Sequence, residues 1–88
     1  MSLVYESNVF SNVSRQDANR IMDKIDWLWG NREYVNHVPL GHNLTGFFKL
    51  KVGDYRVLYE YDKITDEMKI CIIGPRDTIY RDASKKYK

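Results

Sequence analysis

Lys49, Lys51 and Arg56 are three cations on one side of a segment, residues 46–61, whose pattern is that of a β-hairpin. Apolar residues recur at every second position before and after Gly53-Asp54, a dipeptide suited to a two-residue turn because glycine accepts a positive φ. With these two residues as the loop, Lys51 lies directly opposite Arg56. Like charges in that arrangement destabilise a hairpin by a few tenths of a kcal/mol, up to about 1. A bound anion, phosphate above all, would relieve the repulsion.

The same pattern has a second interpretation that needs no ligand. Lysines that alternate with apolar residues are typical of the solvent-exposed side of an antiparallel strand. The pattern alone favours a solvated surface and an anion site about equally. Glu60 shares the cationic side but is expected nearer Phe47, so it does not obviously neutralise the cluster.

Two residues further along the chain could complete this basic surface. Gly74-Pro75-Arg76 ends the next expected strand, and Tyr80 follows shortly after it. Arg76 would then lie beside the hairpin, and a tyrosine can stack on a nucleobase or on a guanidinium. The ordinary interpretations are a surface arginine and a half-buried tyrosine at the sheet edge. Histidines often act as general bases, but the loop position of His37 and His42 favours ordinary loop residues.

The element expected to support the hairpin is a helix from Ser14 to Gly30. Ser14 and Asp17 have the spacing of a capping box, in which hydroxyl and carboxylate satisfy free backbone amides. The apolar stripe of this helix is Ala18, Ile21, Met22, Ile25, Leu28 and Trp29. Gly30 is placed to end the helix in a left-handed conformation. Trp27 lies on the other side of the helix, where it either packs within the domain or contacts a partner.

The remaining pattern predicts an α+β fold with a small antiparallel sheet of three to four strands. A third strand, after the hairpin, is expected over residues 68–73, and a short N-terminal strand over residues 3–5. Residues 31–45 resemble a connecting loop. An N-terminal helix or helical hairpin would pack on one face of the sheet and leave the opposite face free. The tail over residues 84–88 is expected to be frayed.

Length and composition predict one globular domain spanning residues 1–88. The formal net charge of +2 permits an anionic partner without requiring one. No apolar run is long enough to cross a bilayer and no signal-peptide pattern begins the chain, so we expect a cytoplasmic protein without a membrane partner. Cys71 is the single cysteine, and its apolar neighbours favour a packed thiol over a nucleophile. No metal or other cofactor is expected.

The sequence HNLTGFFKLKVGDYRVLYEYD from His42 to Asp62, followed by IIGPRDTIY from Ile72 to Tyr80, resembles the RelE/ParE toxin superfamily. The features that carry the resemblance are Leu44 with Gly46, the basic strand Lys49–Lys51, the segment Gly53–Tyr59, and Arg76 near Tyr80. The resemblance covers most of the C-terminal half of the chain. It implies a RelE-like fold and the toxin half of a type II toxin–antitoxin system, with a cognate antitoxin as partner in a hetero-oligomer.

The resemblance further implies a metal-independent, ribosome-dependent mRNA endoribonuclease, in which a ribose 2′-OH attacks the adjacent phosphate. Such an enzyme must help to remove a proton, stabilise a dianionic phosphorane and protonate the leaving oxygen. The catalytic residues carried over from the family are Lys49 and Lys51 for phosphate orientation and proton removal, Arg56 for transition-state stabilisation, Arg76 as acid or charge stabiliser, and Tyr80 for nucleotide positioning. The alternatives are a ParE-like toxin that binds DNA gyrase without nuclease chemistry, or an inactive relative that only binds antitoxin. The complete cationic set favours the endoribonuclease.

Overall fold

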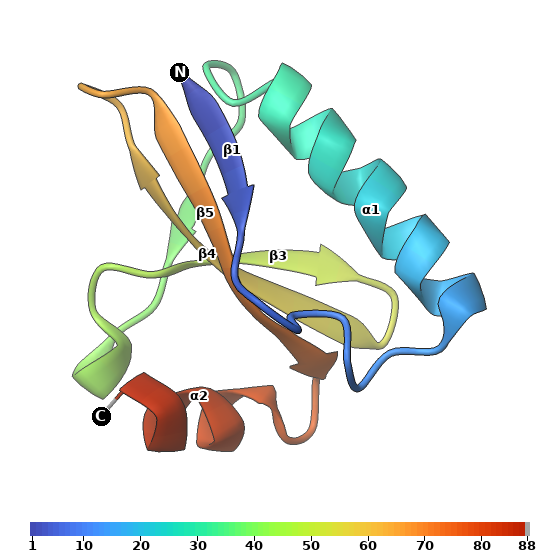
Figure 1. Ribbon diagram of the computed structural model, residues 1–88. Helices are drawn as coiled ribbons and strands as arrows, with labels where there is room; N and C mark the ends of the chain where they lie inside the picture. The colour runs from blue at the N-terminus through green and yellow to red at the C-terminus, as the bar shows by residue number, and fades with distance from the viewer. Residues whose placement is uncertain (88) are drawn as a thin grey trace.

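A computed structural model describes residues 1–87 and places a five-stranded sheet between two helices (Figure 1). Along the chain the elements are β1 (Ser2–Tyr5), α1 (Arg15–Gly30), β2 (Val38–Pro39), the 3₁₀ helix η1 (His42–Leu44), β3 (Phe48–Val52), β4 (Tyr55–Asp62), β5 (Glu67–Pro75) and α2 (Ile79–Tyr87). The sheet order is β1-β5-β4-β3-β2, with β1 parallel to β5 and every other pair antiparallel. The α+β class is confirmed and β1 matches the expected N-terminal strand, but the sheet exceeds the predicted three to four strands because β2 extends one edge.

Helix α1 begins as its capping residue predicts but ends differently. The Ser14 hydroxyl accepts a hydrogen bond from the Asp17 backbone nitrogen at 3.2 Å, whereas the Asp17 carboxylate accepts one from the Tyr55 hydroxyl at 2.9 Å. The prediction of a left-handed Gly30 was wrong. The helix is capped by Asn31 at φ −114°, and its side-chain amide donates to the Trp27 carbonyl at 2.8 Å. Because Asn31 satisfies the last carbonyls, no left-handed residue is needed.

The main core lies between α1 and one face of the sheet. Ile21 and Ile25 are fully buried and Leu28 nearly so, as the apolar stripe predicts. Met22 of the predicted stripe is instead 43% exposed. The strand residues packed against them are Val52, Val57, Tyr59, Met68, Ile70 and Ile73. Burial of each aliphatic side chain of this size contributes roughly 1.5–3 kcal/mol, so this layer fixes α1 over β3, β4 and β5.

The opposite face of the sheet carries a second, smaller core, so the prediction of a free face was wrong. Helix α2 covers it, and the buried residues of this core are Leu44, Phe47, Leu58, Cys71, Ile79 and Ala83. Residues 84–87 are helical rather than frayed, because Ile79, Ala83 and Tyr87 recur at every fourth position and turn together onto the sheet. The Tyr87 hydroxyl donates to the Cys71 carbonyl at 3.1 Å. Lys88, the end of the predicted frayed tail, lies outside the described residues.

A bulge in β5 allows this strand to serve both cores. Leu58 pairs with Ile72 and Tyr59 pairs with Ile70, which leaves Cys71 as the extra residue. Ile70 and Ile73 therefore face α1, whereas Cys71 packs beneath α2. Cys71 is 1% exposed, as the packed-thiol interpretation predicts, and burial raises the pKa of its thiol to about 12.

Residues 31–45 are more regular than the predicted loop. Strand β2 pairs with the start of β3, and the Leu40 backbone nitrogen donates to the Phe47 carbonyl at 2.9 Å. The 3₁₀ helix η1 follows and inserts Leu44 into the second core. Neither helix in residues 1–87 is long and apolar enough to cross a membrane.

Candidate functional site

The hairpin of β3 and β4 has the register that the sequence predicts. Val52 pairs with Tyr55 and Lys51 with Arg56, which makes Gly53-Asp54 the loop. Gly53 has φ +56°, and Asp54 does not share the positive φ. Glycine with a positive φ at the first loop position is typical of a type II′ hairpin turn.

Lys49, Lys51 and Arg56, which we call the basic hairpin surface, lie on the side of the sheet that faces away from α1. Val57 and Tyr59 point into the α1 core, so Arg56 and Leu58 point the other way, and Leu58 packs beneath α2. Within residues 1–87, no ion pair joins any of the three cations to a carboxylate. The like-charge pair of Lys51 and Arg56 therefore stands without a compensating carboxylate on the sheet.

Glu60, the acid nearest in sequence on this face, is directed elsewhere. It is paired with Lys69 across β4 and β5, and its carboxylate accepts a weak contact from the Cys71 thiol at 3.6 Å. Its position toward β5 keeps the acid away from β3, where Lys49 and Lys51 lie.

The Arg56 guanidinium is held by the hairpin turn itself. Its Nη1 donates to the Gly53 carbonyl at 2.9 Å and to the Tyr55 carbonyl at 2.8 Å. In the part of the chain that the structure describes, Nε and Nη2 have no hydrogen-bond partner. A guanidinium with one nitrogen fixed and two available is suited to bind a phosphate or carboxylate oxygen pair.

Two more arginines reach the same turn from other elements. The Arg76 backbone nitrogen donates to the Asp54 carbonyl at 2.8 Å, which places Arg76 beside the hairpin as predicted. Its Nε lies 3.8 Å from the Asp77 carboxylate, but both side chains are largely exposed and such pairs are weak. Arg20, which the sequence analysis missed, extends from α1, and its guanidinium lies 3.2 Å from where a Gly53 side chain would begin. Only the packing of α1 over the turn reveals it.

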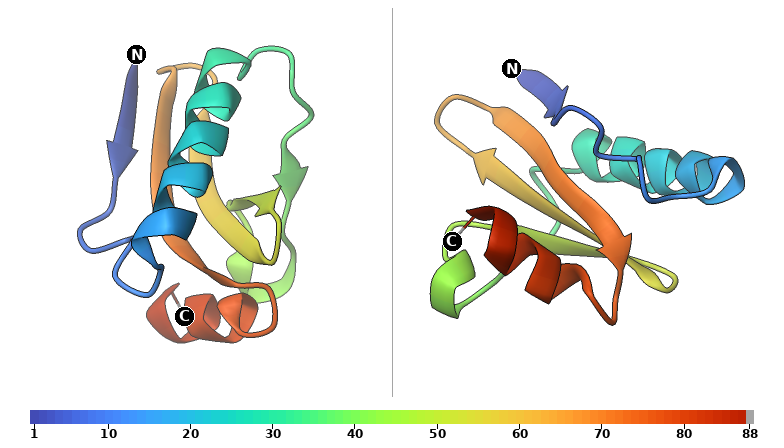
Figure 2. Two further views of the ribbon diagram at one scale, coloured as in Figure 1. Left: turned by 90° about the vertical axis from the view of Figure 1, so that its right-hand side faces the viewer. Right: turned by 60° about the horizontal axis from the view of Figure 1, so that its bottom comes forward.

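Tyr80 lies on the same side of the sheet as the basic hairpin surface, but in a cleft of its own. It is the second residue of α2, packs partly against the second core, and lines a cleft of about 440 Å³ between η1 and α2. Figure 2 shows η1 beside the C-terminal half of the molecule, close to α2. The structure therefore gathers Lys49, Lys51, Arg56 and Arg76 around one hairpin and sets Tyr80 in the adjoining layer.

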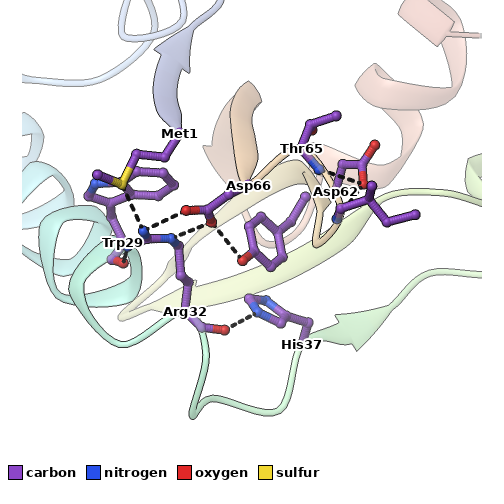
Figure 3. Close-up of polar contacts among 9 residues, drawn as sticks. Met1, Trp29, Arg32, His37, Asp62, Thr65 and Asp66 are labelled. Carbon is purple, nitrogen blue, oxygen red and sulfur yellow. Dashed lines mark hydrogen bonds and ion pairs between the residues drawn. The ribbon is translucent and has the colours of Figure 1, made fainter.

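The two histidines differ in their surroundings. The His37 ring Nδ1 is 2.6 Å from the Tyr59 hydroxyl. Its Nε2 is 2.9 Å from the Arg32 carbonyl, as Figure 3 shows. Since both ring nitrogens are engaged, His37 joins the segment after α1 to the sheet and is not placed as a base. His42 is exposed and has φ +56°.

A second hollow, which we call the edge groove, runs between α1 and the free edge of β3. Its volume is about 450 Å³, and its lining includes Lys24, Trp27, Val38, Lys49, Leu50 and Lys51. Trp27 is 48% exposed, with the Lys24 ammonium 4.1 Å above its ring. Strand β2 pairs with only Phe48 and Lys49, so the remainder of β3 has an open edge among the described residues.

Solved structures share this fold. The isolated RelE toxin of Escherichia coli aligns with a TM-score of 0.66 and 14% identity over 96% of this chain and 95% of that chain. The RelBE2 toxin–antitoxin complex of Mycobacterium tuberculosis aligns with a TM-score of 0.62 and 19% identity over 85% of this chain and 90% of that chain. YafQ from E. coli BL21(DE3) aligns with a TM-score of 0.60 and 15% identity over 88% of this chain and 94% of that chain. The sequence matches no protein-family model and no curated protein. The chain thus has the RelE toxin fold that the resemblance predicts.

Proposed function

We propose that the chain is the toxin of a type II toxin–antitoxin system and cleaves ribosome-bound mRNA without a metal ion. The observation that carries this proposal is the Lys51–Arg56 pair, two like charges fixed opposite each other with no carboxylate partner in residues 1–87. A protein that only presents a solvated surface gains nothing from this arrangement, which costs stability. A phosphate diester bound between the charges would relieve the repulsion, and the RelE fold supports the same substrate.

The proposed reaction is an attack by a ribose 2′-OH on the phosphorus of the next nucleotide linkage. The O2′–P bond forms and the P–O5′ bond breaks, which leaves a 2′,3′-cyclic phosphate and a 5′-OH. Lys49 and Lys51 orient the phosphate and assist removal of the 2′-OH proton. Arg56, already held by the turn carbonyls, stabilises the dianionic phosphorane, and fixed donors of this kind contribute on the order of 10²–10³ in rate. Arg76 stabilises or protonates the leaving oxygen, and Tyr80 positions the nucleotide.

The test is cleavage of a labelled mRNA on programmed ribosomes by the purified chain. We expect products with 2′,3′-cyclic phosphate and 5′-OH ends, and no cleavage when the attacking nucleotide is 2′-deoxy. Lys49→Ala should lower the rate by about 10²-fold, whereas Lys63→Ala, an exposed lysine at the other end of the sheet, should cleave as wild type does. Gyrase-linked DNA breaks without mRNA cleavage, or equal rates for Lys49→Ala and Lys63→Ala, would overturn the proposal.

The partner that would inhibit such a toxin is its antitoxin, and we place one of its segments in the edge groove. The groove combines an exposed aromatic ring, apolar Val38 and Leu50, and the cations Lys24, Lys49 and Lys51. An extended segment with apolar and acidic residues matches this chemistry and could pair with the open edge of β3. Its carboxylates would then neutralise two lysines of the basic hairpin surface, so that the antitoxin and RNA would compete for the same cations.

Trp27→Ala tests this placement through the affinity for the antitoxin. The exposed ring is the largest apolar contact in the groove, so its removal should weaken binding by at least 10-fold, the effect of losing a modest interface anchor. Tyr34→Ala provides the matched control, because Tyr34 is an 84% exposed aromatic residue outside the groove. Equal affinities for Trp27→Ala and wild type would remove the edge groove from the interface.

A further inference from the structure

The cleft between η1 and α2, which we call the η1–α2 cleft, is lined by Tyr80 and otherwise by residues that the proposed reaction does not use. Its volume of about 440 Å³ lies within the roughly 300–1,000 Å³ range of small-ligand sites. The lining residues that the argument uses are His42, Asn43, Tyr80, Arg81 and Ser84. Two aromatic rings, an amide and a guanidinium thus meet in a space suited to a flat, polar group.

The η1 side of this cleft is rigid. His42 has φ +56°, a conformation that non-glycine residues adopt at a cost and that the surrounding structure must maintain. The Thr45 hydroxyl donates to the His42 carbonyl at 2.8 Å, and the Leu44 backbone nitrogen donates to the Gly41 carbonyl at 3.1 Å. Leu44 is 5% exposed and anchors the turn in the second core. The backbone that carries His42 is therefore fixed beside the cleft that this residue lines.

The polar groups of the cleft retain capacity for a ligand. Asn43 Oδ1 accepts a long hydrogen bond from the Ser84 hydroxyl at 3.5 Å, while the Asn43 amide nitrogen has no partner among residues 1–87. The Arg81 guanidinium is only loosely paired, with its Nε 3.9 Å from the neighbouring Asp82 carboxylate and both groups exposed. Stacking on aromatic rings combined with hydrogen bonds to a base edge is how proteins recognise unstacked bases of single-stranded RNA.

The cleft also borders the strand that carries the lysines. Val38 of β2 pairs with Lys49. Leu40 lines the cleft, and its backbone nitrogen donates a hydrogen bond to the Phe47 carbonyl. Tyr80, Arg81 and Ser84 of α2 line the other side of the cleft. Helix α2 covers the face of the sheet that bears the basic hairpin surface, opposite α1 (Figure 2). The cleft and the basic hairpin surface thus lie on the same face of the sheet and are linked through the pairing of β2 with β3.

We propose that the η1–α2 cleft is a nucleobase subsite, in which His42 and Tyr80 stack on one unstacked base and Asn43 reads its edge. This placement rests on the proposed function, because the adjoining phosphate is the one bound at the basic hairpin surface. Asn43 and His42 are then specificity-determining residues, and Arg81 contacts the phosphate on the far side of the bound nucleotide.

The test is an NMR titration of the ¹⁵N-labelled chain, without ribosomes, with the four 5′-mononucleotides and with inorganic phosphate. Inorganic phosphate should shift resonances of the basic hairpin surface but not those of His42, Asn43 and Tyr80. At least one nucleotide should additionally shift the resonances of His42, Asn43, Tyr80 and Arg81. Identical shifts from phosphate and all four nucleotides would overturn the proposal. Shifts of the cleft by an antitoxin segment but by no nucleotide would also overturn it, in favour of protein docking.

Variants separate this subsite from the proposed function. The substitution His42→Gly removes the ring, and glycine accepts the positive φ at this position. It should lower the affinity for the preferred nucleotide on the order of 10-fold. Asn43→Ala should narrow the difference in affinity among the four bases, whereas Asn12→Ala, an exposed asparagine elsewhere, should leave it unchanged. Wild-type mRNA cleavage with no nucleotide in the cleft would refute the subsite alone. Nucleotide binding in the cleft without mRNA cleavage would refute the proposed function alone.

Discussion

Two arginines at opposite ends of β4 show how the same side chain serves two purposes. Arg32 follows α1 and donates from Nε and Nη2 to the Asp66 carboxylate at 2.7 and 2.8 Å (Figure 3). Its Nη1 donates to the Trp29 carbonyl at 2.7 Å, and its guanidinium lies 3.8 Å from the Trp29 ring centre. Arg56, at the other end, donates to two turn carbonyls and faces Lys51. A saturated arginine joins elements of the fold, whereas an unsaturated one opposite a like charge is available for a ligand.

The acids at the two ends differ in the same way. Asp66 lies in the turn between β4 and β5, and it also accepts a hydrogen bond from the Tyr61 hydroxyl at 2.9 Å. These contacts, the Arg32 guanidinium foremost, lower the pKa of the Asp66 carboxyl to about 2. At the hairpin end, no carboxylate in residues 1–87 pairs with Lys49, Lys51 or Arg56. Charge is balanced where the fold is joined together and unbalanced where we propose the chemistry.

The largest effect on stability should come from Arg32→Ala. It leaves Asp66 without its cation and removes the contact that joins the end of α1 to the β4–β5 turn. Urea unfolding should show a clear drop in midpoint for Arg32→Ala, while Arg56→Ala should remain within about 0.5 kcal/mol of wild type. At urea concentrations below its unfolding midpoint, the Arg32→Ala protein should still cleave mRNA. Equal destabilisation by the two substitutions would contradict the division into a structural and a functional end.

The second prediction concerns pH and the Asp66 carboxyl. Its pKa is about 2 in the folded chain against 3.8 as the unperturbed value, so the unfolded state binds the proton first as pH falls. The stabilisation from Asp66 is therefore complete above pH 4 and is lost between about pH 4 and pH 2. Asp66→Asn, which suits the positive φ of 56° at this position, should be less stable at neutral pH and should lose less stability in that acidic interval. Parallel urea midpoints from pH 7 to pH 2.5 for the two proteins would contradict this account.

The smallest effect, and the one of opposite sign, should come from Lys51→Glu. This substitution converts the like-charge pair with Arg56 into an attractive one, so the free energy of unfolding should rise by a few tenths of a kcal/mol, up to about 1. Cleavage should nevertheless be lost, because the phosphate loses a cation and meets an anion. Lys63→Glu in the distant turn is the matched control and should change neither quantity appreciably. A destabilised Lys51→Glu protein would show that Lys51 and Arg56 do not repel each other.

The hairpin could be predicted from the sequence because its determinants are local. Alternating apolar residues and a glycine that accepts a positive φ define the pairing of Lys51 with Arg56, and the structure has that pairing. The Ser14 cap and the α1 stripe are equally local. In these segments, residues close together in sequence decide both the conformation and the face on which each side chain lies.

The features that were missed depend on contacts between distant parts of the chain. A strand over residues 3–5 was expected, but its parallel pairing with β5, more than 60 residues away, was not predicted. Helix α2 is polar at most positions, and its stripe of Ile79, Ala83 and Tyr87 is too sparse to predict a helix without the sheet that it covers. Arg20 and the η1–α2 cleft belong to the same class, because their positions relative to the hairpin exist only after the layers pack.

The most direct test of the account is the single-turnover rate at which Arg56→Ala cleaves mRNA on programmed ribosomes, measured beside Arg15→Ala. Arg15 is an exposed arginine at the start of α1 that has the same charge and makes no hydrogen bond or ion pair with the hairpin among residues 1–87. We predict a loss of about 10²–10³-fold for Arg56→Ala, an unchanged rate for Arg15→Ala, and unfolding midpoints that match wild type in both. Equal cleavage rates for the two variants would contradict the claim that the unpaired cations of the hairpin act on the phosphate.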